Sequence, residues 1–164
     1  MKIRSVVMVL AFGLLVLCGS AAVGGAADGV AVTDPYVRAV PPGQPNSALF
    51  MAVTNNSSMD RALVAAESPA AGVVELHTHI NDNGMMRMRR VEKIDLPVGK
   101  TVMLQPGGLH VMLIGLKQGL VPDQKVSITL LFDDGGKKVL LVPVRKLQMK
   151  MMSGGMKHKM KMDH

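Results

Sequence analysis

Apolar and polar residues alternate over short stretches along most of the chain, which is the period-two pattern of half-buried β-strands. Such stretches lie at residues 29–40, 48–55, 61–68, 72–79, 85–92, 101–105, 109–115, 126–132 and 137–144. Segments rich in Gly, Pro, Asn and Asp separate them, and the DDGG segment between the last two predicts a hairpin. No convincing long helical period is present among these stretches. The pattern therefore predicts a single all-β domain, a β-sandwich or barrel, at residues 28–144.

The first 27 residues depart from this pattern. Lys2 and Arg4 precede an apolar run that is too short to span a bilayer comfortably, and small residues follow it. That order is typical of a secretory signal peptide. The small residues of the GGAAD segment predict cleavage after Ala26 or Ala27, and hence an exported protein.

Cys18 is the single cysteine of the chain and lies inside the predicted signal peptide. A lipid anchor on this cysteine is disfavoured, because the bulky Leu17 stands where a small residue normally precedes a modified cysteine. Cleavage then leaves the mature protein without a thiol. Since no internal disulfide can form, the stability of the domain must come from its core.

Charge is distributed unevenly along the chain. Residues 28–144 hold eleven Lys and Arg against eleven Asp and Glu, whereas residues 145–164 hold six basic residues and one acidic residue. The overall pI of about 9.8 therefore reflects the C-terminal segment. No aromatic-rich basic surface accompanies it, so we do not expect nucleic-acid binding.

Residues 145–164 are basic and of low complexity, which predicts a disordered tail. A solubilising tail needs only Lys and Ser, and an amphipathic membrane helix is disfavoured because Gly154 and Gly155 interrupt it. The composition favours copper binding by this segment, because Met sulfurs suit Cu(I) and imidazoles can also take Cu(II). Any such sites would be auxiliary to a site inside the domain. The candidate tail ligands are Met149, Met151, Met152, Met156, His158, Met160, Met162 and His164.

Candidate metal ligands also gather inside the domain. His77 and Met88 are separated by ten residues, Met88 and His110 by twenty-one, and His110 and Met112 by one. Imidazole together with thioether sulfur suits Cu(I), a soft cation. The absence of cysteine near these residues argues against a blue-copper centre and against a cysteine-rich zinc site. The residues alone therefore predict a soft-metal site on a β-domain.

Strand geometry supports a preformed site. Residues two apart in a strand share a face, so His110 and Met112 point one way, and Leu109, Val111 and Leu113 point toward a core. By the same rule His79 and Met86 are auxiliary candidates beside His77 and Met88. For any single residue an ordinary role is the alternative, because Met commonly fills β-rich cores. The Pro-Gly-Gly turn at 106–108 predicts that His110 begins its strand, near one pole of the sandwich.

The spacing His-x10-Met-x21-His-x-Met resembles the signature of the PCu(A)C family of periplasmic copper chaperones. The segments SPAAGVVELHTH, GMMRMRRVEKIDLPVGKTVMLQPGGLHVMLIGLKQ and LLVPV are similar to that family as well, and the likeness runs from about Val37 to Val144. The resemblance implies a cupredoxin-like Greek-key fold in the periplasm that binds one Cu(I). It implies as ligands His77, Met88, His110 and Met112.

The same resemblance implies delivery of copper for assembly of the CuA centre of cytochrome c oxidase. The implied partners are the CuA subunit and Sco-type thiol proteins, with membrane contact only through them. The alternative is a copper-buffering or resistance protein in which the tail sequesters the metal. An enzyme is disfavoured, because no nucleophile–base pair, His₂Cys set or three-His cluster is visible.

Overall fold

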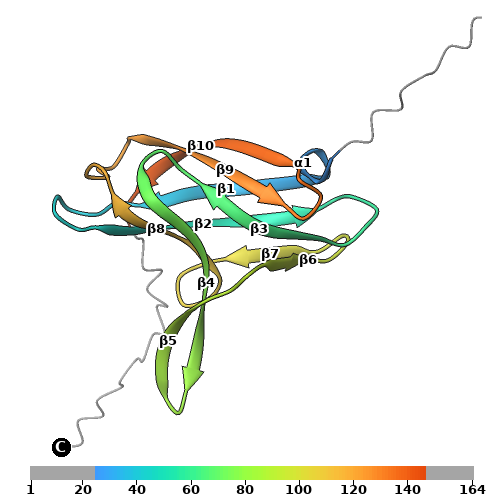
Figure 1. Cartoon of the computed structure of the whole chain (residues 1–164), viewed down its shortest axis with the longest axis horizontal. Helices are drawn as coiled ribbons and strands as arrows, with labels where there is room; N and C mark the ends of the chain where they lie inside the picture. Colours follow the sequence, from blue (N-terminus) through green and yellow to red (C-terminus); the bar gives the residue numbers. More distant parts are fainter. Residues whose placement is uncertain (1–24, 147–164) are drawn as a thin grey trace, which may run out of the picture.

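The computed structural model describes residues 25–146 (Figure 1). Its elements are α1 (Ala26–Gly29), β1 (Val30–Arg38), β2 (Asn46–Asn55), β3 (Arg61–Glu67), β4 (Ala71–Asp82), β5 (Met85–Arg90), β6 (Ile94–Leu96), β7 (Thr101–Leu104), β8 (His110–Leu116), β9 (Lys125–Phe132) and β10 (Lys137–Arg145). The all-β prediction is confirmed. Most of the predicted signal peptide and tail, and every candidate ligand of the tail, lie outside the described residues.

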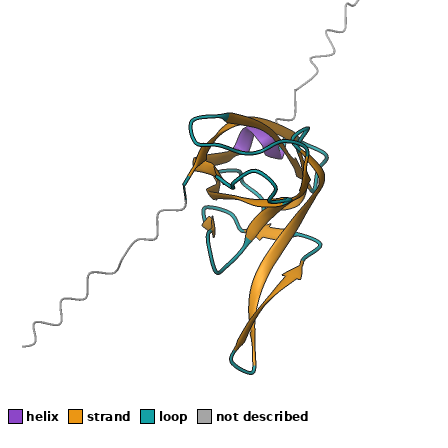
Figure 2. Ribbon diagram, turned by 90° about the vertical axis from the view of Figure 1, so that its left-hand side faces the viewer, coloured by secondary structure: helices purple, strands orange, loops and turns teal. Residues whose placement is uncertain are grey.

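Neighbouring strands follow the order β5-β4-β8-β2-β1-β10-β9-β3-β6, and β7 pairs with β2 beside this path. All pairs are antiparallel except β1 with β10, which run parallel and meet at Val37 and Val144. The strands curve around a common interior, and the β4–β5 hairpin extends away from it (Figure 2). This is the predicted sandwich or barrel.

The core is aliphatic because strand alternation turns every second residue inward. On β9, Val126, Ile128, Leu130 and Phe132 are buried and the residues between them are more exposed. On β8 the predicted inward residues Val111 and Leu113 are fully buried, and Leu109 packs partly buried against the same core. The face opposite Val111 and Leu113 is therefore left for the candidate ligands.

Two short elements were not predicted from the sequence. β6 has only three residues, too few for a periodic pattern, although Ile94 and Leu96 both point into the core. In α1 the Ala26 side chain is 1% exposed, and its backbone N–H donates to Asp134 Oδ2 at 2.6 Å. Cleavage after Ala26 or Ala27 would separate this residue from the domain. None of the described helices is long and apolar enough to cross a membrane.

The last strand continues to Arg145, one position beyond the predicted end of the domain. The Arg145 carbonyl accepts a hydrogen bond from the Ala39 N–H at 2.7 Å, and its guanidinium donates to Asp34 Oδ1 at 2.6 Å. Both contacts fix the end of β10 against β1. A tail-less variant must therefore keep Arg145.

Candidate metal site

The candidate ligands are carried by three adjacent strands, β5, β4 and β8. His77 on β4 lies directly opposite His110 on β8, and His79 lies opposite Met88 on β5. Cross-strand partners in a sheet point to the same face. The pairing therefore brings imidazole and thioether groups from residues far apart in the sequence onto one face, where the hairpin leaves the barrel (Figure 1).

A hollow of about 240 Å³ opens on this face. It holds three of the four predicted ligands together with the auxiliary His79, and it is lined by Arg38, Ala48, Phe50, His79, Met88, Pro106, Gly107, His110 and Met112. His77 is not among the lining residues. Its ring centroid lies 5.9 Å from that of His110, compared with 5.1 Å for His79 and His110. The structure thus places both β4 histidines beside His110.

His110 is the buried member of the cluster, at 2% exposure, and it begins β8 as predicted. Its Nδ1–H donates to the Gly108 carbonyl at 2.9 Å. The turn that presents this carbonyl requires Gly107, whose φ is +82°, and is closed by the Gly108 N–H bonded to the Gln105 carbonyl at 3.0 Å. This arrangement leaves the lone pair on Nε2.

Burial lowers the pKa of the His110 imidazole, against the opposing effect of the Gly108 hydrogen bond. The neighbouring His79, His77 and Arg38 lower it further, because a charge on His110 would face theirs. His110 is therefore neutral over a wider pH range than an exposed histidine. Neutral imidazole is the form that binds a metal.

Sequence reasoning missed Glu75, which lies two residues before His77 on the same face of β4. Its Oε2 accepts a hydrogen bond from His77 Nε2 at 2.8 Å, and its Oε1 lies 3.4 Å from Arg90 Nη1. The hydrogen bond from His77, more than the charge of Arg90, lowers the pKa of the Glu75 carboxyl. The alternation Glu-x-His-x-His at 75–79 was the signal that would have found it.

Exposure differs sharply across the cluster. Met88 is 55% exposed, whereas His110 is 2% exposed. Met86 is 57% exposed and lies opposite Asn81, farther out along the hairpin, so it shares the face of Met88 but does not line the hollow. The cluster therefore has a buried side at His110 and an accessible side at Met88.

Within residues 25–146, no group of three or more His, Cys, Asp or Glu side chains is arranged to hold a metal. The soft donors that line the hollow on the β4–β8 face are imidazole and thioether groups. This donor set suits Cu(I) better than a hard cation. The chemistry of the residues present fits the predicted metal.

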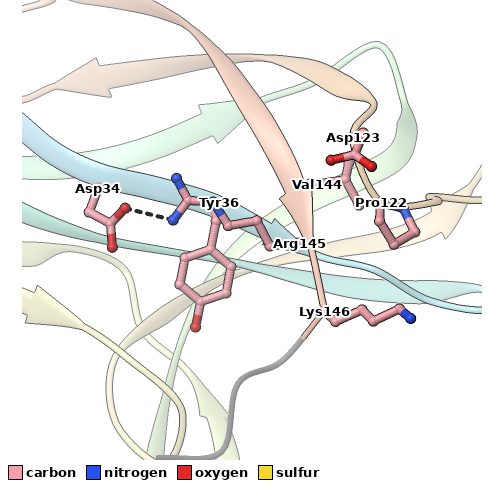
Figure 3. A pocket seen from close by; sticks show the side chains of 7 residues that line it. All are labelled: Asp34, Tyr36, Pro122, Asp123, Val144, Arg145 and Lys146. Carbon is pink, nitrogen blue, oxygen red and sulfur yellow. Dashed lines mark hydrogen bonds and ion pairs between the residues drawn. The ribbon is translucent and has the colours of Figure 1, made fainter.

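A second and larger hollow, about 540 Å³, lies at the end of β10 (Figure 3). Its lining is Asp34, Tyr36, Pro122, Asp123, Val144, Arg145 and Lys146. These side chains include no imidazole, thioether or thiol, and Asp34 is paired with Arg145. Tyr36 connects the two regions. The centroid of its ring lies 5.3 Å from that of Phe50, and the Phe50 centroid lies 6.2 Å from that of His110. The larger hollow lacks the ligands that the smaller one has.

Residues 30–144 match the family model described as "LpqE-like: Putative lipoprotein LpqE-like". A curated relative, the "Putative lipoprotein Lxx21020" of Leifsonia xyli subsp. xyli (strain CTCB07), is 40% identical over 120 residues, which cover 73% of this chain and 71% of that protein. The family match therefore covers every described strand that contributes to the candidate site.

Solved structures are similar as well. The solution structure of apo-DR1885 from Deinococcus radiodurans is 33% identical, with 90% of this chain and 97% of that chain covered and a TM-score of 0.59. The CuI-DR1885 structure is 37% identical, with 71% and 76% covered and a TM-score of 0.57. The copper-bound PCuAC domain from PmoF2 is 24% identical, with 75% and 97% covered and a TM-score of 0.63. The last likeness concerns the fold, and it confirms the predicted cupredoxin-like architecture.

Proposed function

The chain belongs to the LpqE-like family, and we propose that it is an exported copper chaperone that carries one Cu(I) on the β4–β5–β8 face. Copper is its cargo. The proposed ligands are His77, Met88, His110 and Met112. Delivery toward the CuA centre of cytochrome c oxidase, with the CuA subunit and Sco-type thiol proteins as partners, is part of the same proposal and is supported by the resemblance to PCu(A)C chaperones.

The observation that carries the proposal is the juxtaposition of imidazoles and thioethers on one open face. His110 and Met112 share the β8 face, and the β4–β5 hairpin adds His77 and Met88 from the side. Thioethers carry no charge and hold no proton, so a thiolate displaces them readily. Because Met88 is exposed and His110 is buried, an acceptor reaches Met88 first, while His110 retains the ion until the exchange is complete.

The test of the function is Cu(I) titration and X-ray absorption of a chain truncated after Lys146. We expect one equivalent of Cu(I) with mixed nitrogen and sulfur coordination, and transfer of that equivalent to a dithiol acceptor protein. Coordination by oxygen and nitrogen alone would refute the assignment. The matched control is the same chain with Met59→Ala, because Met59 is an exposed methionine on the loop after β2 and does not line the hollow.

Truncation after Lys146 also tests the copper-buffering alternative. The contacts of β10 end at Arg145, so we expect the free energy of unfolding to change by less than about 0.5 kcal/mol. We expect the truncated chain to lose every copper equivalent beyond the first, because the tail holds six Met and two His. Titrating the full-length and truncated proteins side by side measures this. Equal stoichiometry would make the tail a solubilising extension.

Cu(I) affinity should be insensitive to pH near neutrality and should decrease in acid. Protons compete with the metal for imidazole, and at His110 the lowered pKa moves this competition below the ordinary histidine value of about 6.5. The Cu(I) affinity decreases in acid because a proton then occupies the imidazole, and the lowered pKa of His110 means that this residue takes up its proton only at a lower pH. Competition titrations of the truncated chain between about pH 7.5 and pH 4.5 measure the effect. A flat affinity across that range would argue that histidines are not ligands.

The family and the Leifsonia relative are described as lipoproteins, which raises the question of an anchor on Cys18; Leu17 disfavours that anchor in this chain. We propose a periplasmic protein released by cleavage near Ala26 or Ala27. The intact mass of the exported protein decides between these forms, since a lipid-modified protein would begin at Cys18.

A further inference from the structure

We propose that Glu75 is a positioning residue that fixes the tautomer of His77, so that His77 presents Nδ1 to Cu(I) while His110 presents Nε2. This inference rests on the proposed function, because it assigns the ligating atoms of the same site. Glu75 itself is not a ligand, and the two histidines bind the metal through different ring nitrogens.

The two nitrogens of the His77 ring differ in their surroundings. Its Nε2 lies 2.8 Å from Glu75 Oε2. Its Nδ1 is buried and has no hydrogen-bond partner among residues 25–146. Buried polar atoms without a partner are uncommon in folded proteins and call for a ligand, ion or water at that position. Cu(I) supplies such a partner for Nδ1.

Glu75 is the acceptor of the hydrogen bond with His77. An ionised carboxylate only accepts hydrogen bonds, so the proton of the Glu75–His77 bond must be carried by His77 Nε2. The Arg90 guanidinium lies 3.4 Å from the other Glu75 oxygen, and it holds the carboxylate in place from β5. With the proton on Nε2, the lone pair of the neutral ring lies on Nδ1. Carboxylates that orient a metal-binding histidine in this way are a general feature of metal sites.

His110 shows the complementary arrangement. Its Nδ1–H is bound by the Gly108 carbonyl at 2.9 Å, which leaves Nε2 for the metal. The structure therefore provides one acceptor for each histidine, a side chain for His77 and a backbone carbonyl for His110. His79 has only a 3.5 Å contact from Nδ1 to the same Gly108 carbonyl, so its tautomer is not fixed in this way.

The opposite reading of Glu75 is that it blocks Nε2 and competes with the metal. The two roles predict opposite changes in Cu(I) affinity when the charge of Glu75 is removed. If Glu75 positions the ring, removing its charge weakens Cu(I) binding, and if Glu75 competes, removing it strengthens binding. The buried Nδ1 without a partner favours the positioning role.

The experiment compares Glu75→Gln with the matched control Glu92→Gln, a change at an exposed glutamate on the segment after β5. Glutamine keeps the shape of Glu75, but its amide accepts or donates, so it no longer enforces the Nε2–H tautomer. We expect a 10- to 100-fold loss of Cu(I) affinity, the range typical of lost outer-shell partners. In ¹⁵N NMR of the metal-free protein we expect the Nε2–H form of His77 in the parent and a mixture of tautomers in the variant.

Unchanged or tighter Cu(I) binding by Glu75→Gln would overturn the proposal, and so would an Nδ1–H tautomer of His77 in the metal-free parent. Weaker binding with an unchanged tautomer would assign the effect to charge alone and would also overturn it. The NMR measurement needs no copper. A parent protein that fails to bind Cu(I) therefore refutes the proposed function, while the tautomer is still measured separately.

Discussion

His110→Ala is expected to lower the Cu(I) affinity of the tail-less chain by at least about 100-fold, more than the loss of an outer-shell partner costs. The residue begins a strand whose opposite face is locked into the core by Val111 and Leu113. The backbone therefore cannot shift to bring another donor into the same place. Competition titration against a Cu(I) chelator measures the loss, with circular dichroism to verify folding.

His79→Ala is the matched control, because His79 lines the same hollow and lies 5.1 Å from His110, ring to ring. Because His79 is an auxiliary residue, its loss should lower the Cu(I) affinity by less than about tenfold. The loss of affinity in Met112→Ala should lie between those of the two histidine variants, since His79 or water substitutes for a lost thioether. If the double variant His77→Ala with His110→Ala bound Cu(I) as tightly as the parent, the ligand assignment would be wrong.

The part of the site that lies on one strand was predictable from the sequence. Alternation alone put His110 and Met112 on the face opposite Val111 and Leu113, and the structure has them so. The glycine turn at 106–108 likewise predicted where β8 begins. Local rules suffice here because strand period and turn chemistry depend on neighbouring residues only.

The relation between strands was not predictable in the same way. His79 lines the hollow, whereas His77 does not and is instead hydrogen-bonded to the Glu75 side chain. The hydrogen bond from the Ala26 N–H to Asp134 Oδ2 joins α1 to the turn between β9 and β10, and no local pattern reports it. Such contacts follow from tertiary packing, which overrides local preference.

The asymmetry of burial connects this geometry to carriage of a metal. A site enclosed on all sides would hold copper but would release it slowly, because the acceptor must reach the ion before the last ligand leaves. Here the hairpin presents Met86 and Met88 outward, both more than half exposed, above a buried His110. The proposed site is thus accessible from the side of Met88, a thioether that a thiolate displaces readily.

The second large effect concerns stability. Asn55 ends β2, and its side chain is fully buried. Its Nδ2 donates to the Leu96 carbonyl at 2.7 Å and to the Met59 carbonyl at 2.9 Å. Its Oδ1 accepts from the Ser57 N–H at 3.0 Å and from the Ser57 hydroxyl at 2.6 Å. One side chain therefore joins β2, the following loop and β6.

Asn55→Asp is expected to lower the free energy of unfolding by about 3 kcal/mol, because it replaces the two donors with an acceptor that faces the buried Leu96 carbonyl. For a domain of this size the melting temperature should fall by about 10 °C, measured by thermal unfolding.

Asn55→Ala should lower the free energy of unfolding by a similar amount, because it leaves the same carbonyl without the Asn55 donor, whereas Ser57→Ala should lower it by only about 1 kcal/mol. Cu(I) affinity at temperatures where the variants remain folded should be unchanged, because it is Ala48 and Phe50, nearer the start of β2, that line the hollow. If Asn55→Asp were as stable as the parent, the hydrogen bonds of Asn55 would not hold β6 and the loop in place. If Asn55→Asp also lost its copper, the separation of stability from binding would fail.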